Sequence, residues 1–143
     1  MRYTYDPTGR VETVTDPAGG VTRYTYDASR RILTITNPCG IPFLVNEYEP
    51  MTGRVSRQTQ ADDGVFTFTY SVTGSTVTQT VVTNPRGHAT TYRFNAAGFP
   101  LLQMDALGQP TVKEYVAGSN LLLSTTDPLG RVTRTVRAAR REA

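Results

Sequence analysis

The chain has 143 residues, of which 38% are hydrophobic, 9% aromatic and 19% charged, with a formal net charge of +3. This composition is too apolar and too aromatic for a disordered chain, and the length is that of one domain. Residues 1–130 hold ten Lys/Arg and eleven Asp/Glu, which sum to −1, whereas residues 131–143 hold five Arg and one Glu, which sum to +4. The body therefore lacks the basic surface on which nucleic-acid binding depends.

Cysteine usage and hydropathy exclude further classes. Cys39 is the single cysteine, so an internal disulfide is impossible and no thiolate metal cluster can form. No segment approaches the roughly 20 apolar residues of a membrane-spanning helix. The start of the chain has no apolar run typical of a signal peptide, which leaves the compartment open.

The dominant feature is an internal repeat. The first copy, Tyr3–Gly19, and the second, Tyr24–Gly40, share a Tyr-x-Tyr-Asp opening, a basic residue before an apolar one, and an Asp/Asn-Pro-x-Gly close. The opening aromatic recurs six times at steps of 21, 22, 22, 24 and 21 residues, as Tyr5, Tyr26, Tyr48, Tyr70, Phe94 and Tyr115. Repetition at a fixed period of this length indicates a repeat architecture.

Glycines mark two turns in each copy. The second turn ends at Gly19, Gly40, Gly64, Gly87, Gly108 and Gly130. The first turn holds Gly9, Gly53, Gly74, Gly98 and Gly118, with Arg30 at this place in the second copy. Because glycine tolerates positive φ, this placement predicts sharp turns of the backbone.

Each copy has room for two short strands, which predicts an all-β fold. In the first copy we expect a strand over about residues 10–15 and a return strand over about 21–26. The predicted architecture is a single domain of antiparallel β-hairpins in a curved meander strip. Its repeats span approximately 3–23, 24–47, 48–69, 70–91, 92–114 and 115–136, and a basic tail covers 137–143.

The return strands alternate aromatic and polar residues. Tyr24 and Tyr26 flank Thr25, and Tyr92 and Phe94 flank Arg93. Residues two apart in a strand share a face. The rings of successive copies should therefore form a ladder of cross-strand contacts, each contributing roughly 0.2–1 kcal/mol.

The later copies depart from the pattern at definite places. Pro42 cannot donate to a ladder and predicts a bulge or edge irregularity. Residues 61–64 predict a turn without proline, and residues 74–83 predict a long threonine-rich strand. Phe99-Pro100 stands where Arg-apolar is expected, and the tail begins as a strand at Val132.

The repeats resemble the YD repeats of Rhs proteins, which also occur in insecticidal toxin-complex subunits and animal teneurins. The residues that carry the resemblance are Tyr5-Asp-Pro-Thr-Gly-Arg-Val11, Tyr26-Asp-Ala-Ser-Arg-Arg-Ile32 and the Asp16–Gly19 and Asp127–Gly130 turns. The resemblance implies hairpins joined side by side into a strip that spirals into a hollow shell. In bacterial members the shell encloses a toxic C-terminal domain, which a conserved Asp-rich segment releases by self-cleavage. The resemblance thus implies a bacterial parent protein that is exported or at the cell surface.

Candidate chemical groups are isolated in the sequence. His88 is the single histidine, no nucleophile-elbow pattern is present, and Cys39 lies within a turn, so we expect no enzyme activity. Asp62-Asp63-Gly64 lacks the further acidic ligands of a calcium loop. The tail arginines, spaced by three, are interpreted as incidental charge rather than a phosphate-binding stripe. We expect no cofactor and no metal site.

The predicted function is structural: a module of an Rhs-type shell that encloses or presents a toxin domain. The alternative is a surface adhesion or carbohydrate-binding module, and the third hypothesis is a self-cleaving fragment. Expected partners are the rest of the parent shell or another copy of this chain, through exposed sheet edges, and then a toxin domain or glycans.

Overall fold

The computed structural model describes residues 1–135, and the predicted basic tail at 137–143 lies outside them. These residues form thirteen strands and no α-helix. The strands are β1 (Arg2–Tyr5), β2 (Val11–Thr15), β3 (Val21–Tyr26), β4 (Ile32–Thr36), β5 (Pro42–Tyr48), β6 (Val55–Gln60), β7 (Val65–Thr73), β8 (Thr76–Thr83), β9 (Ala89–Phe94), β10 (Pro100–Met104), β11 (Pro110–Tyr115), β12 (Leu122–Thr126) and β13 (Val132–Arg134). Their order in the sheet is their order in the chain, so the predicted antiparallel meander is confirmed.

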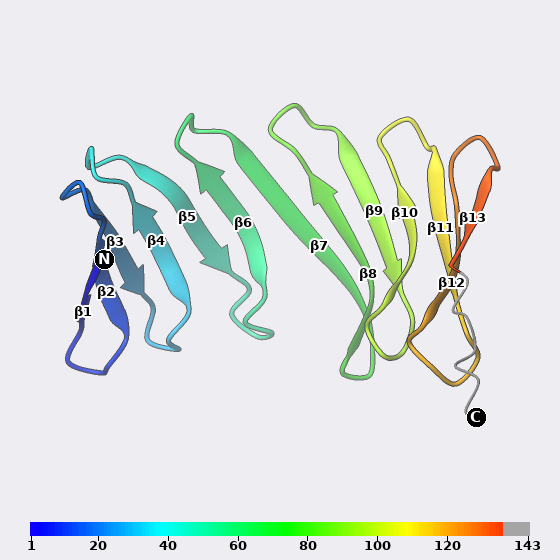
Figure 1. Ribbon diagram of the computed structural model, residues 1–143, viewed down its shortest axis with the longest axis horizontal. Coiled ribbons are helices and arrows are strands. Elements are labelled where there is room, and N and C mark those ends of the chain that lie inside the picture. The colour runs from blue at the N-terminus through cyan, green and yellow to red at the C-terminus, as the bar shows by residue number, and fades with distance from the viewer. Residues whose placement is uncertain (136–143) are drawn as a thin grey trace, which may run out of the picture. The chain divides into compact units, whose positions relative to one another are not determined.

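The chain divides into two compact units, Met1–Phe68 and Thr69–Ala143, and β7 runs across the boundary. In the first unit β1 to β6 lie side by side in antiparallel pairs, and in the second unit β8 to β13 do the same (Figure 1). The sheet order ends at β1 and β13, so each of these strands has one edge without a neighbouring strand in the described chain.

Most turns share one hydrogen-bond pattern. In the first turn the N–H of Asp6 donates to the carbonyl of Arg10 at 2.8 Å, and the N–H of Gly9 donates to the carbonyl of Asp6 at 2.9 Å. The residue in Gly9's place has a positive φ, between 60° and 90°, in most turns, whereas in the turn at Val116 the donor is Ser119 and the positive φ falls one residue earlier, at Gly118. The turn glycines with this geometry include Gly19, Gly40, Gly87, Gly108 and Gly130.

Gly64 is the exception among the predicted turn glycines. Here the turn begins one residue earlier than predicted, since the N–H of Asp63 donates to the carbonyl of Gln60. Asp63 therefore takes the left-handed conformation, with φ of 60°. The carboxylate of Asp62 accepts the N–H of Gly64 at 3.1 Å, which holds the turn in this register.

Arg30 occupies the left-handed position of its turn with φ of 67°. A side chain in this region costs about 1–2 kcal/mol because its Cβ crowds the following carbonyl oxygen. We expect Arg30→Gly to raise the free energy of unfolding by about 1 kcal/mol, since the gain is offset by the larger entropy of glycine in the unfolded chain. Urea titration measures the change, and Ser29→Gly, one residue earlier, is the control. Equal stabilisation by both variants would contradict this account.

The predicted irregularity at Pro42 is confirmed. Thr36 of β4 pairs with Pro42 of β5, and the register shifts between Ile35 and Thr36. The predicted long strand of the fourth copy begins at Thr76 rather than Gly74, because Gly74 is a turn residue with φ of 63°.

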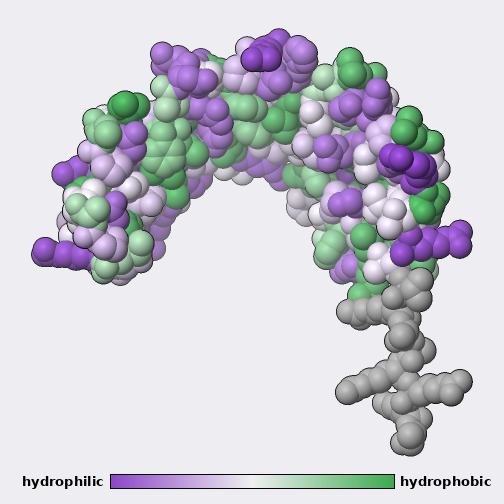
Figure 2. Space-filling view, turned by 45° about the horizontal axis from the view of Figure 1, so that its top comes forward, coloured by the Kyte–Doolittle hydropathy of each residue, from purple (hydrophilic) through white to green (hydrophobic). Residues whose placement is uncertain are grey.

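The sheet has no dry hydrophobic core. Among the described residues no hydrophobic side chain is buried, and the buried ones are the polar Thr13, Asn46 and Ser124. Leu107, Leu129 and Met51 are 82%, 77% and 98% exposed. Hydrophilic and hydrophobic residues are interleaved over the visible surface (Figure 2). Backbone pairing and the half-buried side chains between repeats must therefore stabilise each unit.

Candidate functional site: the junctions between repeats

The aspartate of each Tyr-Asp pair holds the first turn together. One carboxylate oxygen of Asp6, Oδ1, accepts the backbone N–H groups of Thr8 at 2.9 Å and Arg10 at 3.0 Å. The other oxygen, Oδ2, accepts Nε of Arg10 at 2.7 Å. Asp27 does the same in the next copy, where Nε of Arg31 lies 2.6 Å from its Oδ2. The carboxylate therefore both shapes the turn and orients the arginine.

The oriented arginine reaches the next copy of the repeat. The guanidinium carbon of Arg10 lies 4.6 Å from the ring centroid of Tyr26, and Nη1 of Arg10 donates to the carbonyl of Asp27 at 3.3 Å. Arg31 lies over Tyr48 in the same way, at 4.2 Å. A guanidinium at this distance is attracted to the face of the ring. Each Asp–Arg pair thus connects one hairpin to the tyrosine of the following copy.

The tyrosine hydroxyl closes the junction. The hydroxyl of Tyr26 donates to the carbonyl of Val11 at 2.8 Å, and that of Tyr48 donates to the carbonyl of Ile32 at 2.6 Å. Val11 and Ile32 directly follow Arg10 and Arg31. The ring is therefore fixed by a cation on its face and a backbone acceptor at its tip, which explains a tyrosine at this position.

A junction without arginine keeps the same arrangement. Phe99 occupies the place of Arg10 and Arg31, and its ring contacts Tyr115 edge to face, with centroids 5.8 Å apart and planes at 61°. The hydroxyl of Tyr115 still donates to the carbonyl of the residue that follows, Pro100, at 3.0 Å. Phenylalanine thus replaces a cation–ring contact with a ring–ring contact. At this junction the rings of two copies are in contact, as the predicted aromatic ladder requires. At the first two junctions an arginine side chain contacts the tyrosine ring instead.

A register shift precedes the marker tyrosine at four places. It falls between Thr4 and Tyr5, Thr25 and Tyr26, Glu47 and Tyr48, and Glu114 and Tyr115. The extra residue lies in the partner strand, for example Glu12 opposite Tyr5, and such a bulge increases the local twist of the pair. The bulge is therefore part of how each ring is placed, and periodicity in the sequence did not predict it.

The residue before several of the marker aromatics forms a polar pair with the neighbouring strand. The hydroxyls of Thr4 and Thr13 lie 2.6 Å apart, as do those of Thr25 and Thr34. Ser124 donates to Glu114 at 2.8 Å. Since neighbouring residues in a strand point to opposite faces, these pairs lie on the side of the sheet away from the rings.

The turn hydrogen bonds lower the pKa of three aspartates. For Asp6 and Asp27 the largest cause is the backbone N–H of Arg10 and Arg31 respectively, with the arginine side chain adding to it and partial desolvation opposing it. The pKa of Asp127 is lowered in the same way, first by the backbone N–H of Arg131. All three lie below the ordinary value of 3.8.

These shifts predict acid sensitivity. A carboxylate whose pKa is lower in the folded chain stabilises the fold above its unfolded pKa, and this contribution is lost as pH falls through the folded value. We expect the urea midpoint to fall as the pH is lowered below about 4. Asp27→Asn should flatten the profile, because Asn37 and Asn84 form the same turn with a neutral side chain. A profile that is unchanged in Asp27→Asn would contradict the assignment.

The other predicted site residues lie as follows. Tyr5 is 60% exposed, whereas the remaining five marker aromatics are half-buried. Cys39 and His88 are exposed, and no group of three metal-ligating side chains exists within residues 1–135. The stabilising role of the marker rings stays a prediction. The arginine after the first turn is the functional residue that the sequence reasoning missed, although its recurrence before an apolar residue was visible.

The geometry defines a class of protein: a β-hairpin repeat sheet whose copies are joined by an Asp–Arg–Tyr connection. Residues 5–40, which contain the first of these junctions, match the family model described as RHS Repeat. The predicted resemblance to Rhs/YD repeats is therefore confirmed. No curated protein matches the chain in sequence.

Solved structures share the fold. A segment of the TcdB2-TccC3-Cdc42 crystal structure matches with a TM-score of 0.65 and 16% identity, over 87% of this chain and 7% of that one. The TcdB2-TccC3 crystal structure matches with the same values. The Photorhabdus luminescens Tc holotoxin pore matches with a TM-score of 0.55 and 17% identity, over 91% of this chain and 6% of that one. The chain thus corresponds to a small part of much longer chains.

Proposed function

We propose that this chain is a non-enzymatic structural segment of an Rhs-type shell, which encloses or presents a polymorphic toxin domain of an exported bacterial protein. The observation that supports this most is the repeat junction, in which Arg10 of one copy covers Tyr26 of the next. Through such a junction each copy packs against the next one, so the sheet can be extended by adding further copies. The short span of the chain within the long Tc toxin chains agrees with this role.

The two outer strands are the proposed contacts with the rest of the shell or with another copy. All four residues of β1 and all three of β13 are exposed. An unpaired strand presents free N–H and C=O groups to another chain. We expect concentration-dependent self-association in light scattering. A monomer at all concentrations, with rapidly exchanging amides in β1 and β13, would contradict edge pairing.

The two other functions have less support in the site. Glycan binding on aromatic rings requires an uncovered face, but guanidinium groups lie over Tyr26 and Tyr48. Self-cleavage at Asp127 would need a reactive carboxylate, whereas Asp127 is bound by Nε of Arg131 at 2.6 Å and by the N–H groups of Leu129 and Arg131. These are the contacts that Asp6 makes in an ordinary turn.

Protease protection in the parent protein tests the shell. The segment that follows the repeats should resist digestion, and Tyr26→Ala with Tyr48→Ala should make it susceptible by opening the wall. Leu107→Ala, at a turn position that is 82% exposed, is the matched control and should leave protection unchanged. Equal digestion of this segment in the wild type and in the double variant would overturn the shell function. A cut after the repeats that Asp127→Ala abolishes, in a protein whose following segment is not protected, would instead favour the self-cleaving fragment.

A further inference from the structure

At three repeat junctions one side chain lies against the marker aromatic of the next copy. At the first two junctions this side chain is an arginine, and at the junction of Tyr115 it is Phe99. Arg10, Arg31 and Phe99 each stand six residues before the Asp or Asn that opens the second turn of their own copy. We call this place the covering position, because its side chain covers the marker ring of the following copy.

In the fourth copy the covering position holds a threonine, Thr78. Because Gln79 of β8 pairs with Arg93 of β9, the next residues along the two strands, Thr78 and Phe94, lie side by side. The hydroxyl of Thr78 donates to the carbonyl of Ser71 on β7 at 3.2 Å. A threonine side chain held in this way is too short to cover the face of the Phe94 ring.

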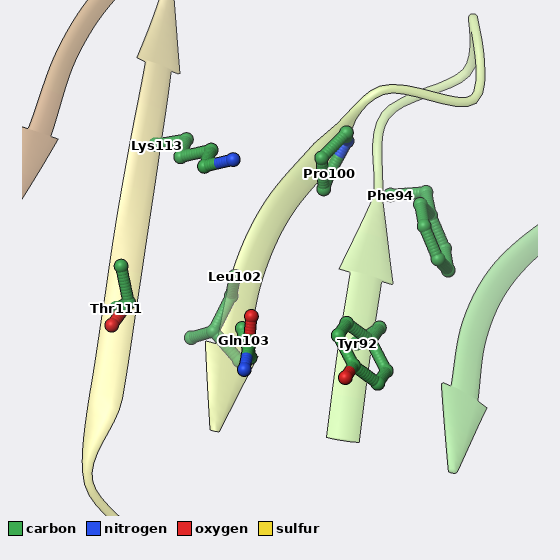
Figure 3. Close-up of a pocket in the computed structure, with 7 residues that line it drawn as sticks. All are labelled: Tyr92, Phe94, Pro100, Leu102, Gln103, Thr111 and Lys113. Carbon is green, nitrogen blue, oxygen red and sulfur yellow. The ribbon is translucent and has the colours of Figure 1, made fainter. Parts of the chain in front are cut away.

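A hollow of about 320 Å³ lies beside the Phe94 ring at this place. Its other lining residues, which all belong to the second unit and carry no charge, are Tyr70, Thr76, Val77, Thr80 and Gly98. The ring of Phe94 points away from β10 and from Lys113, so this lysine lies on the other side of β9 (Figure 3). The hollow is therefore bounded by the marker aromatics of two successive copies, and the residue at the covering position does not fill it.

The charge of the covering side chain matches the turn residue four positions before it. Arg31 follows Asp27 and pairs with its carboxylate, whereas Phe99 follows the neutral Asn95. The hollow has no carboxylate in its lining, so a partly desolvated guanidinium would find no counter-charge there. A neutral ring is therefore the group that this hollow favours.

We propose that the hollow binds a small neutral aromatic molecule. The flat ring of the ligand lies between Tyr70 and Phe94, as Phe99 lies against Tyr115 at a later junction, and gains stacked or edge-to-face contacts. An apolar cavity of about 150 Å³ takes up benzene, so this hollow has room for a fused two-ring molecule such as indole. The hydroxyl of Thr80 offers an acceptor for the indole N–H. This site is independent of the shell function.

Amide chemical shifts of the full chain test the proposal, with indole as the probe. We expect saturable shifts at residues 76–80, 94 and 98, with a dissociation constant of about 1 mM for a ligand of this size. Ethylguanidinium, a cation with the chemistry of an arginine side chain, should bind about fivefold more weakly, because the hollow offers no carboxylate. The absence of saturable shifts with indole, or tighter binding of ethylguanidinium than of indole, would overturn the proposal.

Two variants at the covering position separate filling of the hollow from loss of a hydroxyl. Thr78→Phe supplies from within the chain the ring that Phe99 supplies elsewhere, so it should abolish indole binding. Thr78→Val keeps the size of the side chain and removes the hydrogen bond to Ser71, so it should bind indole as the wild type does. Loss of binding in both variants, or in neither, would overturn the proposal, and the wild-type comparison of indole with ethylguanidinium decides it if Thr78→Phe does not fold. A capped Gly-Trp-Gly peptide that binds more tightly than indole would also overturn it, because the hollow would then belong to a polypeptide partner.

Discussion

Tyr48→Ala is expected to lower the free energy of unfolding of the first unit by about 3 kcal/mol. The ring is half-buried beneath Arg31, at 4.2 Å, and its hydroxyl donates to the carbonyl of Ile32. Truncation removes the ring surface, the cation–ring contact and the hydrogen bond together. It also removes a neighbour of Asn46, whose amide donates to the same carbonyl at 3.0 Å. Urea unfolding followed by tyrosine fluorescence or circular dichroism measures the loss.

Two control variants separate the contribution of the hydroxyl from that of the ring. Tyr48→Phe keeps the ring and should cost about 1 kcal/mol for the hydrogen bond alone. Tyr5→Ala changes the same position of the first copy, where the ring is 60% exposed and no earlier copy in this chain supplies an arginine, so it should cost less than about 0.5 kcal/mol. A similar loss in Tyr5→Ala and Tyr48→Ala would show that the junction does not stabilise the sheet.

Arg31→Ala is expected to lower the free energy of unfolding by about 2 kcal/mol. The guanidinium contacts the Tyr48 ring on one side and the Asp27 carboxylate on the other, and its removal leaves both without this partner. Arg31→Lys should recover little of the loss, because an ammonium cannot stack as a flat group on the ring while binding the carboxylate.

Arg31→Phe is the sharper variant, because the chain already contains this replacement at Phe99. The edge-to-face contact of Phe99 with Tyr115 predicts that Arg31→Phe loses less than half as much stability as Arg31→Ala. Its unfolding should also depend less on salt, since the Asp27–Arg31 ion pair is gone. Thermal unfolding at low and high salt distinguishes the variants. Equal destabilisation by Ala and Phe would contradict the equivalence of the two junction types.

The repeats, the strands, most turns and the antiparallel order followed from the sequence because they depend on local features. Glycine spacing marks where the backbone takes a positive φ, and alternation of Tyr24, Thr25 and Tyr26 marks a strand with two different faces. The turn at Gly64 was misplaced by one residue because Asp63 also tolerates the left-handed region, which glycine counting does not register.

What only the tertiary structure decided is what each ring contacts. Arg10 and Tyr26 are sixteen residues apart, and they meet because the Asp6 carboxylate orients Arg10 and the register of β3 shifts against β4 at Tyr26. Hydrophobic periodicity in the sequence predicts neither the register shift nor the contact of an arginine with a ring on another strand. The same reason applies to Phe99 and Tyr115, which are also sixteen residues apart and whose rings meet edge to face.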